Sequence, residues 1–83
     1  MKFIAEIDVM PLKALLDPQG KAVSHGLNKM GLSQIENVRI GKHITLEIDA
    51  ASHDVAKQKV EEACKKLLSN PIMENFHFQL QEL

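Results

Sequence analysis

The side chains that could carry chemistry are few in this sequence, and they are scattered. The four histidines, His25, His43, His53 and His77, show no H-x-x-x-H or Cys–His spacing. Because metal sites usually show such local spacing, we predict no metal ligand in this chain. The single cysteine, Cys64, cannot form an internal disulfide, and its place on an apolar helical stripe favours packing over nucleophilic attack.

The motifs that handle phosphates or activate nucleophiles are missing as well. The chain has no glycine-rich phosphate loop, no Walker motif and no G-x-S-x-G. Asp17 could serve as an acid or a base, but Pro18 directly after it favours helix capping, because proline suits the first helical position. Since nothing assembles a nucleophile, a base and an oxyanion site, we predict no catalytic and no cofactor-binding residue. The chain is typical of a binding or assembly module.

Length and composition point to one small domain over residues 1–83. The formal net charge of −1 does not mark a nucleic-acid binder, and no apolar run reaches the roughly 20 residues needed to span a bilayer. Charged residues appear too early at the N-terminus for a signal peptide. A lone cysteine favours a reducing, cytoplasmic setting, and so small a domain without disulfides often gains stability by oligomerising.

Hydrophobic periodicity predicts four strands and two helices. The strands are expected over residues 2–10, 35–40, 44–48 and 72–80. The first helix is expected over 15–31, capped by Asp17 and stopped by Gly31, and the second runs from the cap Ser52 to Asn70-Pro71. We predict an α+β two-layer sandwich in the βαββαβ ferredoxin-like order, an antiparallel four-stranded sheet with both helices on one face.

Two details of this fold can be predicted from the pattern. A three-residue loop, Gly41-Lys42-His43, would pair Ile40 with Ile44 and Val38 with Leu46, which keeps the apolar side chains on one face. In the second helix the buried stripe is expected to comprise Ala56, Val60, Ala63, Cys64 and Leu67.

Gly20 and Gly26 are unusual because glycine destabilises a helix interior by roughly 1 kcal/mol relative to alanine. One interpretation is close packing of the helix on the sheet of the same chain. The other, for Gly20, is a helix N-terminus left open to a ligand or a partner.

Three stretches resemble motifs of one family. They are Leu16-Asp17-Pro18-Gln19-Gly20, Val38-Arg39-Ile40-Gly41-Lys42, and Cys64 to Pro71 followed by Glu74. Their order and spacing resemble PurS, the small subunit of phosphoribosylformylglycinamidine (FGAM) synthase in purine biosynthesis. Met73, Asn75 and Phe76 depart mildly from the family pattern.

The resemblance implies a non-catalytic subunit of a carbon–nitrogen ligase complex, which converts formylglycinamide ribonucleotide (FGAR), ATP and glutamine to FGAM. The partners it implies are a second copy of the chain, the synthetase subunit PurL, which uses ATP and magnesium, and the glutaminase subunit PurQ. It implies no cofactor in this chain, no nucleic acid and no membrane. The small subunit would join the two enzymes and assist ammonia transfer between them.

We expect the partner interface to draw on charged, open-backbone or rigid positions of the three motifs. These candidates are Asp17, Gln19, Gly20, Arg39, Gly41, Lys42, Asn70, Pro71 and Glu74. The main alternative is an ACT-like regulatory domain, whose ligand loop resembles Asp17-Pro18-Gln19-Gly20 superficially but with a different proline spacing. A stand-alone enzyme of a small ferredoxin-like family would need a convergent polar pocket, for which the sequence offers no candidate.

Overall fold

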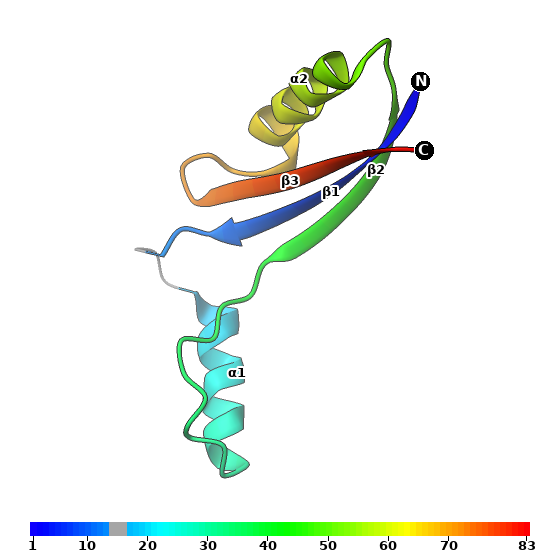
Figure 1. Cartoon of the computed structure of the whole chain (residues 1–83). Helices are drawn as coiled ribbons and strands as arrows, with labels where there is room; N and C mark the ends of the chain where they lie inside the picture. The colour runs from blue at the N-terminus through cyan, green and yellow to red at the C-terminus, as the bar shows by residue number, and fades with distance from the viewer. Residues whose placement is uncertain (14–16) are drawn as a thin grey trace.

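A three-stranded antiparallel sheet forms the centre of the molecule (Figure 1). The computed structural model describes residues 1–13 and 17–83. The strands are β1 (Lys2–Pro11), β2 (Lys42–Asp49) and β3 (Glu74–Glu82), in the order β2-β1-β3. As the alternation predicts, Phe3, Ala5, Ile7 and Val9 of the central strand are buried, because every second side chain of a strand points to the same face.

One helix covers the apolar face of this sheet. α2 (His53–Ala63) packs across β1 and β3, with Ala56 and Val60 buried in the core. Its start is the predicted one, since the Ser52 hydroxyl accepts from the backbone N–H of Val55 at 3.3 Å. The pairs Glu61–Lys65 and Glu62–Lys66 lie on its solvated side.

The end of this helix corrects one residue of the predicted stripe. A π-helical turn, η1 (Cys64–Leu68), follows α2, and the backbone N–H of Ser69 donates to the carbonyl of Cys64 at 3.0 Å. A π turn holds more residues than an α turn, so it shifts the buried position by one residue. Leu68 therefore packs on the core, while Leu67, predicted to be buried, is 82% exposed.

The prediction of a fourth strand in this chain is wrong. Residues 35–41 have no regular secondary structure and pair with no strand among the described residues, and the expected Gly41-Lys42-His43 loop does not form. The reason lies in β2, because Lys42 pairs with Val9 and His43 with Asp8. Since two of the three loop residues are already part of the sheet, too few remain to reverse the chain.

α1 (Pro18–Lys29) has the predicted capping residues, but it does not lie on the sheet as predicted. Asp17 caps it, Pro18 opens it, and Gly31 after it has a φ of 82°. The expected start at Leu15 and Leu16 falls outside the described residues. Figure 1 shows α1 projecting away from the sheet, so the expectation of two helices on one sheet face is wrong.

This projection makes the molecule long and thin. Its principal extents are 52, 27 and 14 Å, and its radius of gyration is 16.4 Å. A compact domain of this length would have a radius of gyration of about 12 Å. The accessible surface of 6113 Å² also exceeds the roughly 5,000 Å² of a compact monomer of this mass. No described helix has the length and apolarity needed to cross a bilayer.

Candidate partner-binding surfaces

The motif segments meet at the end of the sheet from which α1 projects. The Asp17 carboxylate accepts from two backbone N–H groups, that of Gly20 within α1 and that of Ile40 in the segment 35–41 before β2, both at 2.9 Å. These two hydrogen bonds, with the nearby charge of Arg39, lower the pKa of Asp17 below its ordinary value. Asp17 is thus a helix cap, as predicted, and also a tie between α1 and the segment that returns to the sheet.

Gly20 allows this tie because it has no side chain. A Cβ at this position would collide with the backbone carbonyl of Val38 and would lie 2.8 Å from an Asp17 oxygen. Close packing is therefore confirmed for Gly20, although its neighbour is Val38 in the segment 35–41 rather than the sheet. Gly26 has no such neighbour within 4 Å. Because the chain itself fills the space beside the first turn, the structure does not favour an open ligand site at Gly20.

A second set of contacts joins the start of β2 to the start of β3 and to the turn before it. Lys42 Nζ on β2 lies 4.0 Å from Glu74 Oε2 on β3, and Glu74 Oε1 accepts from the backbone N–H of Asn70 at 2.8 Å. Gly41 is pressed against the Val9 carbonyl and the Met10 side chain. The predicted residues of the second and third motifs are therefore joined through Glu74.

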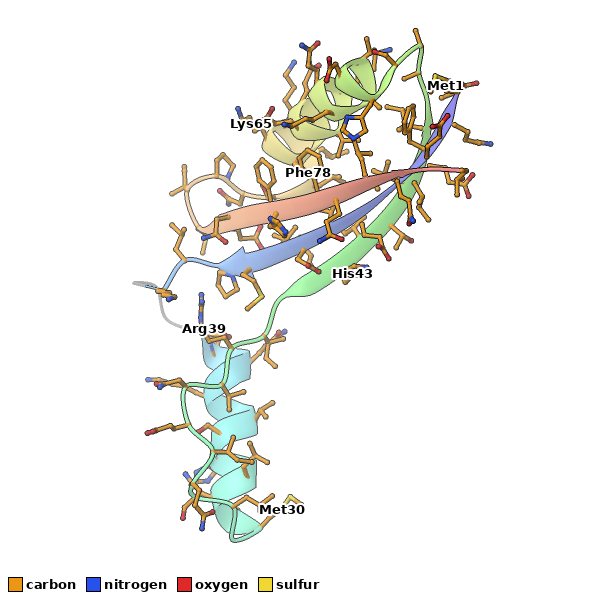
Figure 2. The ribbon with its side chains drawn as sticks, in the orientation of Figure 1. Met1, Met30, Arg39, His43, Lys65 and Phe78 are labelled. Atoms are coloured by element: carbon orange, nitrogen blue, oxygen red, sulfur yellow. The ribbon has the colours of Figure 1, made fainter. Side chains whose placement is uncertain are left out.

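The remaining candidates lie beside these contacts. Arg39 stands where α1 meets the sheet (Figure 2), and its Nη2 is buried without a hydrogen-bond partner among the described residues. The sequence predicted a hairpin loop beside Arg39 and Lys42, but neither residue lies at one. Gly41 leads into β2 without a turn. Gln19 is exposed on the first turn of α1, and Pro71 is exposed on the turn before β3.

The turn between η1 and β3 forms an exposed apolar corner. An open groove of about 480 Å³ is lined by Lys65, Ser69, Pro71, Glu74, Asn75 and Phe76. Leu67, in η1, and Ile72, within this turn, are 82% and 81% exposed. Exposed apolar side chains that gather in one place usually mark a protein contact. Hydrophobic periodicity did not predict that Leu67 is exposed, because no sequence signal indicates the π turn.

A second exposed apolar surface lies on α1 and the segment after it. Its large exposed side chains are Val23, Met30, Leu32 and Ile35. Val23, Leu27 and Met30 follow each other at helical spacing, as the sequence predicts, but they face no part of the described sheet. The two apolar surfaces therefore lie at different parts of an elongated molecule.

The side chains that could carry out chemistry do not come together in one site among the described residues. His43 Nδ1 lies 2.6 Å from Asp8 Oδ1 on the open sheet face, and the ring of His53 meets Phe3 edge-on. Burial raises the pKa of the Cys64 thiol, which suits a packed side chain. Within residues 1–13 and 17–83, no three histidine, cysteine or carboxylate side chains are placed to hold a metal ion.

Comparison with known proteins gives one consistent result. The sequence profile described as "PurS: Phosphoribosylformylglycinamidine (FGAM) synthase" matches residues 4–82. The synthase subunit PurS of Bacillus subtilis is 38% identical over 71 residues, which cover 86% of this chain and 83% of that protein.

Solved structures agree with the sequence comparison. A crystal form of B. subtilis PurS superposes with a TM-score of 0.86 at 35% identity, covering 96% of this chain and 99% of that one. A chain in the structure of PurLQS from Thermotoga maritima gives a TM-score of 0.89 at 30% identity, covering 98% and 99%. The junction of three motifs, the fold and these similarities agree: the chain belongs to the PurS family of FGAM synthase subunits.

Proposed function

We propose that this chain is the structural subunit that joins the glutaminase PurQ to the synthetase PurL in an FGAM synthase. The observation that carries the proposal is the pair of exposed apolar surfaces, one on α1 and one at the corner before β3. A subunit that binds two kinds of partner needs two such surfaces, and surfaces of this kind are typical of protein contacts. The neighbour in the T. maritima PurLQS structure supports the same role.

The chemistry of the reaction explains why such a subunit is useful. Ammonia released from glutamine would be lost or protonated in bulk water before it reached a second active site. A subunit that fixes the two enzymes against each other keeps the transfer path short and closed. In this proposal ATP and magnesium belong to PurL, this chain binds no cofactor, and the complex is cytoplasmic with no nucleic acid or membrane partner.

We also propose that the chain self-associates, as a dimer or a dimer of dimers. The monomer exposes roughly 1,000 Å² more surface than a compact domain of its mass. A stable interface buries about 800 Å² on each partner, so the excess is large enough for one.

The test is reconstitution from purified subunits. The chain is mixed with PurL and PurQ of the same organism, and the mass of the complex is measured by analytical ultracentrifugation. The double variant Leu67→Ser/Ile72→Ser should weaken the complex about tenfold or more, equivalent to about 1.4 kcal/mol. Leu83→Ser, at another exposed apolar residue just after β3, serves as the matched control. Full binding by the double variant, or no complex with the unchanged chain, would contradict the proposal.

A further inference from the structure

We infer that the free edge of β3 binds an extended segment of one of the two enzyme subunits as a further antiparallel strand. The bound segment has apolar and polar residues in alternation and a basic residue opposite Glu82. This inference rests on the proposed function, because it states how this chain holds one of the enzymes that it joins.

The hydrogen-bonding pattern leaves a row of backbone groups of β3 open along its outer side. β3 is an edge strand, paired only with β1 among the described strands. Just after the strand, the N–H of Leu83 donates to the Lys2 carbonyl at 2.8 Å, and the register along the strand has no break. Odd-numbered residues of β3 therefore bond to β1, and even-numbered residues turn their N–H and C=O groups outward. The outward-facing residues in the middle of the strand are Phe76, Phe78 and Leu80.

β3 lacks the features that usually protect an edge strand. It is nine residues long, contains no proline, lysine or arginine, and pairs with β1 without a bulge. Its acidic residues stand only at its two ends, Glu74 and Glu82. Natural edge strands are commonly short, bulged or marked by lysine or proline, so a long and regular edge is a ready template for another strand.

The side chains of β3 specify which kind of segment fits beside it. The core face carries half-buried apolar side chains, namely Phe76, Phe78 and Leu80. Figure 2 shows Phe78 on the side of the sheet where α2 lies. The open face carries exposed polar side chains, namely Asn75, His77 and Gln79. Because neighbouring strands share their two faces, the bound segment needs apolar residues on the core face and polar residues on the open face.

The apolar corner before β3 continues this edge. Its open groove of about 480 Å³ is lined by Phe76 of β3 and by Ser69 and Lys65 at the end of the helix. Lys65 Nζ lies 3.7 Å from a Glu61 carboxylate oxygen, so its charge is already matched within the chain. An apolar side chain of the bound segment beside Phe76 would lie at this groove. Main-chain hydrogen bonds along an edge, with a pocket for alternate side chains, are the two elements of recognition by strand addition.

Charge favours an enzyme segment over a second copy of β3. Two copies that pair antiparallel about Phe78 would place Glu74 of each opposite Glu82 of the other, and like charges directly opposite each other destabilise a sheet. Glu74 already lies 4.0 Å from Lys42, whereas Glu82 is exposed and forms no ion pair among the described residues. A lysine or arginine of the bound segment opposite Glu82 would complement this charge.

A methyl group on the backbone nitrogen of Phe78 tests the edge directly. Cys64 follows Ala63, so a recombinant 1–63 thioester can be joined to a synthetic 64–83 peptide by native chemical ligation. The methyl group removes the outward N–H and blocks close approach, yet it leaves the bonds to β1 and every side chain in place. Assembly with PurL and PurQ should weaken about tenfold or more by ultracentrifugation, because a hydrogen bond is lost and the neighbouring strand is displaced. The ligated chain without the methyl group is the matched control, and circular dichroism verifies that both are folded.

The outcomes separate this inference from the proposed function. If the methylated chain assembles as well as its control, strand addition is wrong while the joining role stands. If the control itself forms no complex, the proposed function is wrong and the inference falls with it. If methylation lowers the mass of the free chain and leaves assembly with the enzymes intact, the edge binds a second copy, which also overturns the inference.

A pair of substitutions tests the chemistry of the segment without altering the backbone. Glu82→Gln removes one negative charge at the end of β3, and Glu36→Gln removes one from another exposed glutamate away from this strand. Glu82→Gln should weaken assembly about two- to fivefold at low salt, as expected for loss of an exposed ion pair, and less at high salt. Glu36→Gln should leave assembly unchanged. Equal assembly by the two variants at low salt overturns the basic residue opposite Glu82 and with it the proposed segment.

Discussion

Replacing the two glycines of α1 by alanine should have opposite effects on stability. At Gly26 a Cβ meets nothing within 4 Å, so Gly26→Ala should gain the helix propensity of alanine, about 0.5–1 kcal/mol. At Gly20 the same Cβ collides with the Val38 carbonyl and crowds the Asp17 carboxylate. Because the colliding atom belongs to the backbone, it cannot turn away as the end of a flexible side chain could.

Overpacking of this kind destabilises by about 1–3 kcal/mol, which exceeds the gain in propensity. Gly20→Ala should therefore lose about 1–2 kcal/mol of unfolding free energy. For a domain of this size 1 kcal/mol shifts Tm by about 4–8 °C, so the variants should lie on opposite sides of the unchanged protein. Thermal unfolding followed by circular dichroism at a fixed protein concentration measures both. Equal increases in Tm for both variants would refute the close approach of Gly20 and Val38.

Three further predictions concern charge, pH and the thiol. Arg39→Glu should weaken assembly of the synthase complex about tenfold, measured by ultracentrifugation, and leave the far-UV circular dichroism spectrum unchanged. The control is Lys57→Glu, on the exposed side of α2. Equal binding by the two variants would contradict the role of Arg39. The pKa of Asp17 is lowered, so its stabilising contribution is complete above its ordinary value of 3.8 and is lost as the pH falls through the lower value of the folded state. The difference in Tm between the unchanged protein and Asp17→Asn should therefore shrink below about pH 4, and a difference that grows on acidification opposes this. Because burial raises the pKa of the Cys64 thiol, a disulfide reagent should react with it slowly until denaturant is added, whereas immediate reaction would show that the core around it is open.

Local signals in the sequence were reliable where a short stretch determines the structure. Asp17, Pro18 and Gly31 punctuate α1 as predicted, and Ser52 caps α2. The alternation of Phe3, Ala5, Ile7 and Val9 places the central strand and its buried face correctly. In each case a capping side chain or a strand period acts within a few residues, so no distant information is needed.

The sequence-based prediction failed where the conformation of a segment depends on residues far away in the sequence. The pattern from Val38 to Leu46 is that of a hairpin, but the pairing of Lys42 and His43 with β1 removes the turn. The π turn after Ala63 exposes Leu67. Hydrophobic spacing assumes a regular α-helix, so it does not predict this turn. The three motifs could be found in the sequence, yet only the fold shows that Asp17 bonds Ile40 and that Glu74 joins Lys42 to Asn70.

The most direct test of the proposed role compares two nitrogen sources in one reaction. FGAM formation from FGAR and ATP is measured with PurL and PurQ, with and without this chain, once with glutamine and once with ammonium salt. We predict that the chain strongly raises the glutamine-dependent rate and leaves the ammonia-dependent rate nearly unchanged, because in the proposed role it joins two active sites and supplies no catalytic group. Equal stimulation of both rates, or no stimulation of the glutamine-dependent rate, would contradict it.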